Sequence, residues 1–136
     1  MVTGYSGTPL QKKLGLKPGI VGAVINPPPH YWELLGPLPE HIELRPLAAG
    51  DLDWVHLFVT SRDALADAIV EARARIRPNG AIWVSWPKRA AKVPSDITED
   101  VIRDMALAAN LVDVKVCTVD ATWSGLKLVI PVRHRV

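Results

Sequence analysis

Short apolar runs rich in β-branched residues alternate with amphipathic segments along most of this chain, and two such runs follow one another directly at its end. The runs occupy residues 20–25, 42–47, 54–60, 81–86, 112–119 and 126–132. Runs of this kind are typical of buried strands. Strands that are separated by helices run parallel, whereas the last two, joined by a short loop, must pair antiparallel. We therefore predict an α/β fold with a doubly wound, mostly parallel, Rossmann-like sheet and a C-terminal antiparallel hairpin.

The predicted helices begin at residues that favour capping. Ser61 precedes a segment with one apolar face, and Thr98 precedes another that starts with two acidic residues. Asn110 suits a left-handed position after the second of these helices. A turn is expected at residues 77–80, and shorter helices at residues 10–14, with Thr8 as the N-cap, and at residues 30–35.

The length and composition of the chain fit a single folded domain. The 136 residues fit a single α/β domain over positions 1–136, and the 49% hydrophobic fraction excludes a disordered chain. Cys117 is the only cysteine, so no internal disulfide can form, which favours a reducing compartment. No apolar stretch approaches the roughly 18 residues of a membrane span, and residues 1–11 lack the features of a signal peptide. We expect a cytoplasmic protein with no membrane contact.

The element order, together with three short stretches, resembles the core of class I S-adenosylmethionine (SAM)-dependent methyltransferases. The stretches are residues 16–19 before the first strand, residues 77–84 at the fourth, and the closing helix and hairpin. Residues 4–10, 86–92 and 122–127 resemble more closely a family of short bacterial proteins that is known only as a domain of unknown function. The first resemblance implies a methyltransferase-like fold and a SAM site. The second implies no activity.

The turn after the first strand departs from the methyltransferase pattern. A Gly-rich turn is expected there, because SAM lies against bare backbone and accepts hydrogen bonds from N–H groups. Here Asn26 is followed by three prolines, Pro27–Pro29, which have no N–H and fill the space. The acidic residue expected at the end of the second strand is also missing, since Glu43 lies too early. The segment before residue 54 is too short for a further strand and helix. We therefore expect no cofactor and assign no catalytic residue.

Ligands of doubly wound sheets bind outside the carboxyl ends of the strands, an edge that we call the rim. Three cations of the rim, Lys88, Arg89 and Lys92, suit a phosphate or carboxylate. His30 is placed for catalysis but has no evident carboxylate partner in the sequence. The candidate ligand-binding residues of the rim are Asn26, His30, Thr60, Ser61, Arg62, Trp86, Lys88, Arg89, Lys92, Asp120, Trp123 and Ser124.

The tryptophans fall into two groups. Trp54 and Trp83 lie within strands and are expected to pack in the core. Trp86 and Trp123 end strands, where they could either stack on a flat ligand or cap the core. We expect both indoles to lie beside Lys88 and Arg89.

Other classes of ligand fit the sequence less well. The histidines lack metal-ligand spacing, so no metal site is expected, and a net charge of +2 without a basic stripe does not favour nucleic acid. A non-catalytic module that binds a small anion or a protein partner is the main hypothesis. The alternatives are an active SAM-dependent methyltransferase with an atypical cofactor loop, and a structural or assembly protein. In methyltransferase strand order, residues 112–119 form an edge through which copies could pair into a homo-oligomer.

Overall fold

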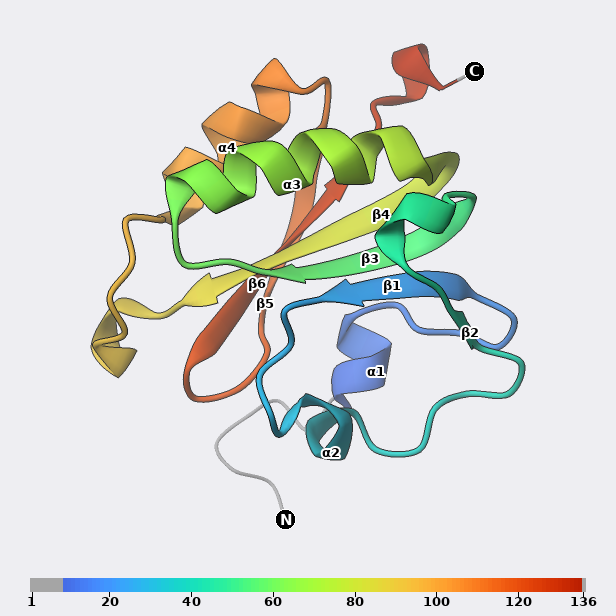
Figure 1. Ribbon diagram of the computed structural model, residues 1–136, viewed down its shortest axis with the longest axis horizontal. Helices are drawn as coiled ribbons and strands as arrows, with labels where there is room; N and C mark the ends of the chain where they lie inside the picture. The colour runs from blue at the N-terminus through green and yellow to red at the C-terminus, as the bar shows by residue number, and fades with distance from the viewer. Residues whose placement is uncertain (1–8, 136) are drawn as a thin grey trace.

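A computed structural model describes residues 9–135, and the strands of this part form one six-stranded sheet in the order β2-β1-β3-β4-β6-β5 (Figure 1). The strands are β1 (Val21–Ile25), β2 (Glu43–Leu44), β3 (Leu52–Phe58), β4 (Ile76–Pro87), β5 (Val112–Thr118) and β6 (Trp123–Val129). Strands β1 to β4 pair in parallel, and β6 runs antiparallel to both β4 and β5. The predicted mostly parallel sheet with a C-terminal antiparallel hairpin is thus confirmed.

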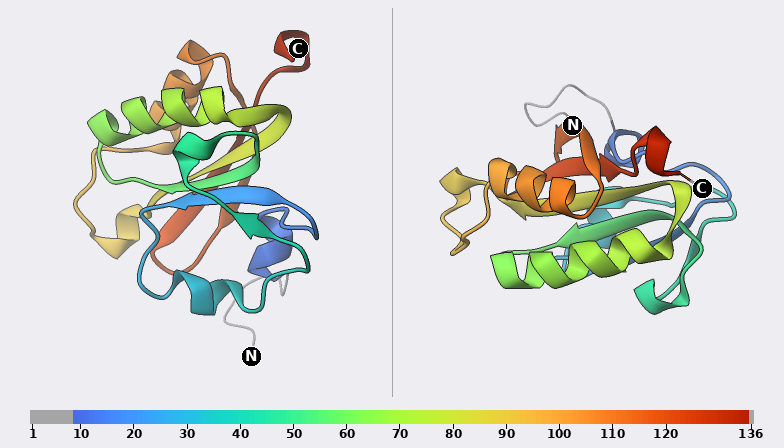
Figure 2. Two further views of the ribbon diagram at one scale, coloured as in Figure 1. Left: turned by 45° about the vertical axis from the view of Figure 1, so that its right-hand side comes forward. Right: turned by 90° about the horizontal axis from the view of Figure 1, so that it is seen from above.

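Helices cover both faces of the sheet (Figures 1 and 2). The α-helices are α1 (Leu10–Lys13), α2 (Tyr31–Leu35), α3 (Arg62–Arg75) and α4 (Glu99–Ala108), and three 3₁₀ turns, η1 (Leu47–Ala49), η2 (Arg89–Ala91) and η3 (Val132–His134), complete the list. Helices α3 and α4 lie on one side of the sheet, and α1 and α2 lie on the other. Within the described residues no helix combines the length and apolar character needed to cross a membrane.

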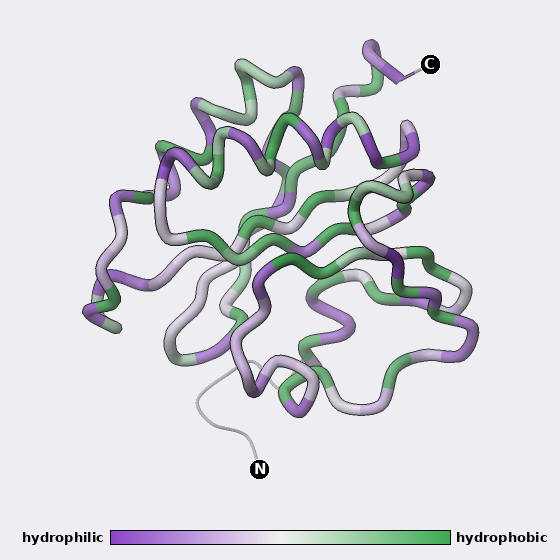
Figure 3. The backbone as a smooth tube through the Cα atoms, in the orientation of Figure 1, coloured by the Kyte–Doolittle hydropathy of each residue, from purple (hydrophilic) through white to green (hydrophobic). Residues whose placement is uncertain are grey.

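Alternation along the strands divides the core into an aliphatic and an aromatic half. Val55, Leu57 and Val84 are fully buried toward α3 and α4. Trp54 and Trp83 are buried toward α1 and α2, and both indole N–H groups donate to the Leu14 carbonyl, at 2.8 and 2.9 Å. Hydrophobic residues concentrate accordingly in the central strands (Figure 3). The expected core role of these two tryptophans is confirmed.

The predicted caps of the two long helices are present. The Ser61 hydroxyl accepts from the Ala64 amide at 3.2 Å, and the Thr98 hydroxyl accepts from the Val101 amide at 3.2 Å. Asn110 adopts the left-handed conformation with φ 60°. Thr8, the expected cap of α1, lies outside the described residues, and Pro9 occupies the N-cap position of that helix.

Several strand boundaries differ from the prediction. β4 begins directly after α3, and the expected turn at residues 77–80 is a bulge within it, because Ile76 pairs with Leu52 whereas Ala81 pairs with Trp54. β2 is limited to two residues, since Pro46 has no N–H to donate to a longer ladder. The chain between β2 and β3 contains only η1, so no further strand extends this side of the sheet. β6 starts at Trp123 rather than at residue 126.

The hairpin places β6 inside the sheet and β5 at its edge, as the methyltransferase order implies. The pairing of β5 with β6 shifts register between Asp113 and Lys115, so the edge carries a bulge at Val114. A bulge and charged side chains are features that hinder pairing of an edge strand with a second chain. The homo-oligomer expected through this edge stays a prediction.

Candidate functional site

A groove of about 580 Å³ opens at the rim, on the side of the sheet that α3 and α4 cover. Its walls come from the end of β4, the loop that follows, and the first residues of α3, α4 and β6. Trp86, Pro87 and Ile97 are buried and give it an apolar base, to which Val93 of the loop adds a more exposed apolar side chain. The groove thus combines an apolar surface with the polar groups of two helix N-termini.

Three cationic and two acidic side chains line this groove: Arg62, Lys88, Arg89, Asp96 and Glu99. Asp96 is held by Arg62, whose amide donates to Asp96 Oδ1 at 2.8 Å and whose Nε–H donates to the Asp96 carbonyl at 2.8 Å. Each of these two side chains thus binds the backbone of the other residue, and they form no ion pair.

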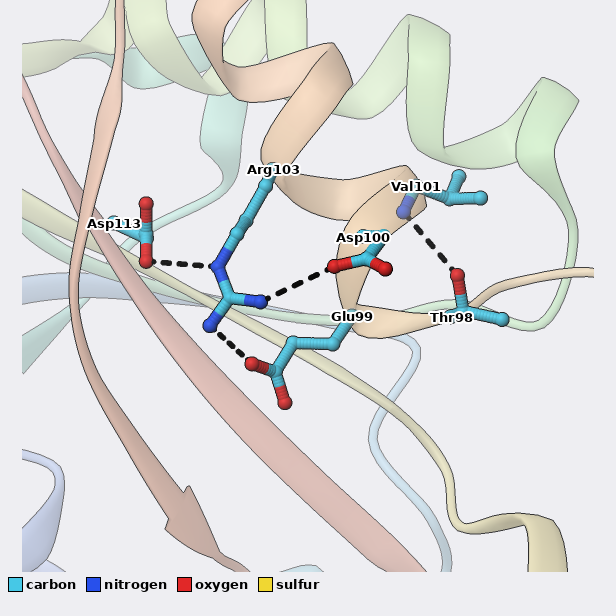
Figure 4. A network of polar contacts seen from close by, with 6 residues as sticks. All are labelled: Thr98, Glu99, Asp100, Val101, Arg103 and Asp113. Atoms are coloured by element: carbon cyan, nitrogen blue, oxygen red, sulfur yellow. Dashed lines mark hydrogen bonds and ion pairs between the residues drawn. The ribbon is translucent and has the colours of Figure 1, made fainter.

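Glu99 is engaged by Arg103, which ties α4 to β5 (Figure 4). The Arg103 guanidinium also pairs with Asp100 at 3.4 Å and donates from Nε to Asp113 Oδ2 at 3.0 Å. These contacts, with the neighbouring carboxylates, raise the pKa of Arg103, which stays charged. Neither Lys88 nor Arg89 forms an ion pair with any described residue. Lys88 and Arg89 are therefore cations of the groove whose charge no described carboxylate neutralises.

The structure brings five of the predicted rim residues to this groove: Arg62, Trp86, Lys88, Arg89 and Ser124. The other seven, Asn26, His30, Thr60, Ser61, Lys92, Asp120 and Trp123, do not line it. Ser61 is used as the cap of α3. Lys92, although it follows Arg89 closely in sequence, ends η2 in a left-handed conformation with φ 56°.

Both indoles of the rim lie at strand ends beside the loop that carries Lys88 and Arg89, but only Trp86 lines the groove. Trp86 pairs with Ser124 and Trp123 pairs with Pro87, so the two tryptophans point to opposite faces of the sheet. Trp86 is only 8% exposed and belongs to the aliphatic core. Trp123 packs edge-to-face on Phe58, with ring centroids 5.1 Å apart. Lys88 and the hairpin do lie at the same end of the sheet, because the Lys88 amide donates to the Thr122 carbonyl at 2.7 Å.

A contact that sequence reasoning missed joins His30 to Asp120. His30 Nε2 lies 2.7 Å from Asp120 Oδ2, and Asp120 Oδ1 accepts from the amides of Thr122 and Trp123 at 2.8 and 2.7 Å. Partial burial acts to raise the pKa of Asp120, but the hydrogen bonds from His30 and the two amides outweigh it and lower that pKa. The loop after β1 is thereby fastened to the β5–β6 hairpin.

The turn after β1 differs from the Gly-rich turn whose backbone N–H groups bind SAM. Asn26 ends the strand with φ 55°, and the next three residues are prolines without an N–H. The first amide after the prolines is that of His30, and the next, that of Tyr31, already donates to the Pro28 carbonyl at 3.0 Å. Three consecutive residues of this loop therefore offer no backbone donor to a cofactor. The described residues also contain no group of three His, Cys, Asp or Glu side chains that could hold a metal ion.

A second contact beyond sequence reasoning is a chain of buried polar groups beneath the rim. His56 Nδ1 lies 2.9 Å from the Tyr31 hydroxyl, and His56 Nε2 lies 2.7 Å from the Ser85 hydroxyl. All three side chains are 0% exposed. Burial lowers the pKa of His56 from 6.5 to about 3 and raises that of Tyr31 above its usual range, so both are neutral. With no access to solvent, this chain stabilises the fold rather than forming a reaction site.

Comparisons with known proteins agree with the fold. The model of a family described as "Protein of unknown function (DUF3052)" matches residues 49–132. No curated protein matches the sequence. A SAM-dependent methyltransferase from Aquifex aeolicus is similar in structure, with a TM-score of 0.62 and 15% identity over 90% of this chain and 88% of that one.

Two further solved structures resemble the chain. Magnesium protoporphyrin IX methyltransferase from Synechocystis PCC 6803, with bound SAM, gives a TM-score of 0.57 and 11% identity over 90% of this chain and 74% of that one. The ribosomal protein L11 methylase from Lactobacillus delbrueckii subsp. bulgaricus gives a TM-score of 0.55 and 12% identity over 88% and 73%. At these identities the likeness shows a methyltransferase-like core and no activity.

Proposed function

Since the chain belongs to the family of proteins of unknown function DUF3052, whose description carries no activity, we propose a function from its geometry. In this proposal the protein is a non-catalytic module with a methyltransferase-like core, and it binds a small anionic ligand in the rim groove. The observation that carries this proposal is that two cations of the groove have no carboxylate partner. Glu99 is paired with Arg103 and the Asp96 carboxylate accepts from the Arg62 backbone amide, whereas Lys88 and Arg89 line the groove without an ion pair among the described residues.

The surroundings of these cations indicate the chemistry of the ligand. Charge-assisted hydrogen bonds from a lysine and an arginine suit a carboxylate or a phosphate, and Arg89 can bind such a group through two N–H donors. Trp86, Pro87 and Val93 offer an apolar surface beside them. We therefore expect an acid with a small apolar part, bound with its charged end toward the loop after β4.

The test compares the wild-type protein with the variant Lys88→Ala/Arg89→Ala in a thermal-shift screen of acidic metabolites, phosphosugars, nucleotides, SAM and S-adenosylhomocysteine. A ligand that binds the folded state raises its melting temperature. We expect an acid to stabilise the wild type and to lose this effect in the variant, while the unliganded variant stays within about 0.5 kcal/mol of wild-type stability, as is usual for exposed charges. A variant stabilised as strongly as the wild type would refute the proposal.

An active methyltransferase is the second candidate, because the three similar structures reported above are methyltransferases or a methylase by name, and one holds SAM. The proline loop after β1 speaks against it, since three consecutive residues there have no N–H to donate. Both SAM and S-adenosylhomocysteine are in the screen for this reason. Stabilisation by either compound, unaffected by the Lys88 and Arg89 substitutions, would favour this candidate over the anion-binding module.

A further inference from the structure

Three lysines gather on the face of the sheet opposite the rim groove, the face that α1 and α2 partly cover. This lysine cluster consists of Lys17 in the loop after α1, Lys115 on β5 and Lys127 on β6. Lys115 and Lys127 are paired directly across the two antiparallel strands. Lys13 Nζ donates to the Thr118 carbonyl at 3.3 Å, which places α1 over the hairpin.

A direct cross-strand pair of like charges destabilises a sheet. Side chains at opposite positions have Cβ atoms about 5 Å apart, so both ammonium groups share one small region of the surface. Burial lowers the pKa of Lys127, and the neighbouring charges of Lys115 and Lys17 lower it further. Sequence reasoning did not single out these residues, because Lys17 is distant in sequence from the hairpin and only the register brings Lys115 opposite Lys127.

No carboxylate of the described residues neutralises this charge. None of their ion pairs involves Lys17, Lys115 or Lys127. Asp113 is the nearest acid along β5, but it pairs with Leu128, which belongs to the aliphatic face, and its carboxylate binds Arg103 of α4 (Figure 4). The charge of the cluster is therefore available to a ligand from outside the chain.

We propose that the lysine cluster is a second anion site, which binds the phosphate groups of a small, multiply charged anion between Lys115 and Lys127, with Lys17 adding a third ammonium group. An oxyanion with several oxygens can accept hydrogen bonds from more than one ammonium group at once, and it converts the repulsion between them into attraction. Lysine serves here as a compact point charge, which suits phosphate oxygens without requiring the planar geometry of arginine. This site is separate from the rim groove, so it does not depend on the function proposed above.

The experiment measures inorganic pyrophosphate binding by calorimetry at low ionic strength. The test variant is Lys115→Gln/Lys127→Gln, and the control is Arg73→Gln/Arg75→Gln, which also removes two positive charges but from α3, on the other face of the sheet. We expect the test variant to bind at least about tenfold more weakly than the wild type and the control to stay within about twofold, since only close cations form charge-assisted bonds. Adenosine diphosphate, run in parallel, distinguishes a free diphosphate from a diphosphate ester as the preferred source of these groups.

Three results would overturn the proposal. The first is that the wild type does not bind pyrophosphate at millimolar concentration. The second is that the test variant binds pyrophosphate as tightly as the wild type. The third is that the test and control variants lose the same affinity, which would indicate attraction by net charge alone. A loss confined to Lys88→Ala/Arg89→Ala, measured alongside, would assign the pyrophosphate to the rim groove instead.

Thermal unfolding supplies a second readout. Lys127→Gln should melt at a higher temperature than the unliganded wild type, because it relieves the like-charge pair, and pyrophosphate should stabilise the wild type more than this variant. If Lys127→Gln melts at a lower temperature without ligand, Lys127 stabilises the fold as it stands, and the premise of an uncompensated pair is wrong.

Discussion

His30 and Asp120, 90 residues apart in sequence, meet at 2.7 Å between Nε2 and Oδ2 and fasten the loop after β1 to the β5–β6 hairpin. The same carboxylate closes the hairpin, because its other oxygen accepts from the amides of Thr122 and Trp123. One aspartate therefore sets both the shape of the hairpin and its position over the proline loop.

Substitutions at this contact should separate its two roles. Asp120→Ala removes the hairpin acceptor and the His30 contact, so we expect it to lower the free energy of unfolding by about 1 to 2 kcal/mol. His30→Ala removes only the half-exposed pair and should cost less than about 1 kcal/mol. Asp120→Asn, which keeps an acceptor for the two amides, should lie between them. Urea unfolding measures all three, and an Asp120→Ala cost no larger than that of His30→Ala would show that the turn contributes nothing.

The lowered pKa of Asp120 predicts that the protein loses stability in acid. Its pKa is lowered in the folded state, so its contribution is complete above the pKa of the unfolded chain and is lost as pH falls through the folded value. Asp120→Asn should therefore lose less stability than the wild type between neutral and strongly acidic pH. Parallel unfolding curves for the two proteins across this range would contradict the prediction.

The buried His56 should add a second dependence on pH. Its pKa is about 3 in the folded state against 6.5 in the unfolded chain, so the unfolded state binds the extra proton between these values. Stability should consequently fall as pH drops from 6.5 toward 3, by up to about 1.4 kcal/mol per pH unit from this group. Nuclear magnetic resonance should show the folded His56 ring still neutral at pH 5, and a ring that titrates near 6.5 would contradict the burial that causes the shift.

SAM and S-adenosylhomocysteine should not bind measurably in calorimetry at millimolar ligand, because the loop Pro27–Pro29 offers neither N–H donors nor the space of a Gly-rich turn. The variant Pro27→Gly/Pro28→Gly/Pro29→Gly restores backbone donors and serves as the comparison. A micromolar dissociation constant for the wild type would refute the interpretation of this loop.

Cys117 should react slowly with thiol reagents in the folded protein. Burial raises the pKa of its thiol, and the charges of Lys13 and Lys115 offset this only in part. Gly125 lies opposite Cys117 on β6 and is buried, and a Cβ atom added to it would lie only 3.4 Å from the Cys117 sulfur. Labelling under native conditions should be much slower than in denaturant, and equal rates would show that β5 does not hold the thiol as described.

Elements of the fold that depend on local chemistry could be predicted from the sequence. The apolar β-branched runs predicted the strands, Ser61 and Thr98 marked the starts of the long helices, and Pro27–Pro29 revealed the departure from a cofactor turn. Each of these follows from neighbouring residues alone: a hydroxyl caps the amide three residues on, and proline lacks an N–H wherever it stands.

Which distant side chains meet depends on strand pairing and could not be predicted from the sequence. Trp86 and Trp123 both end at the rim, yet the register that pairs Trp123 with Pro87 turns the two indoles to opposite faces. The same kind of pairing sets Lys115 opposite Lys127, and it carries Asp120 to His30. Side chains alternate between faces along a strand, so a shift of one residue in pairing exchanges the faces, and local sequence does not specify that shift.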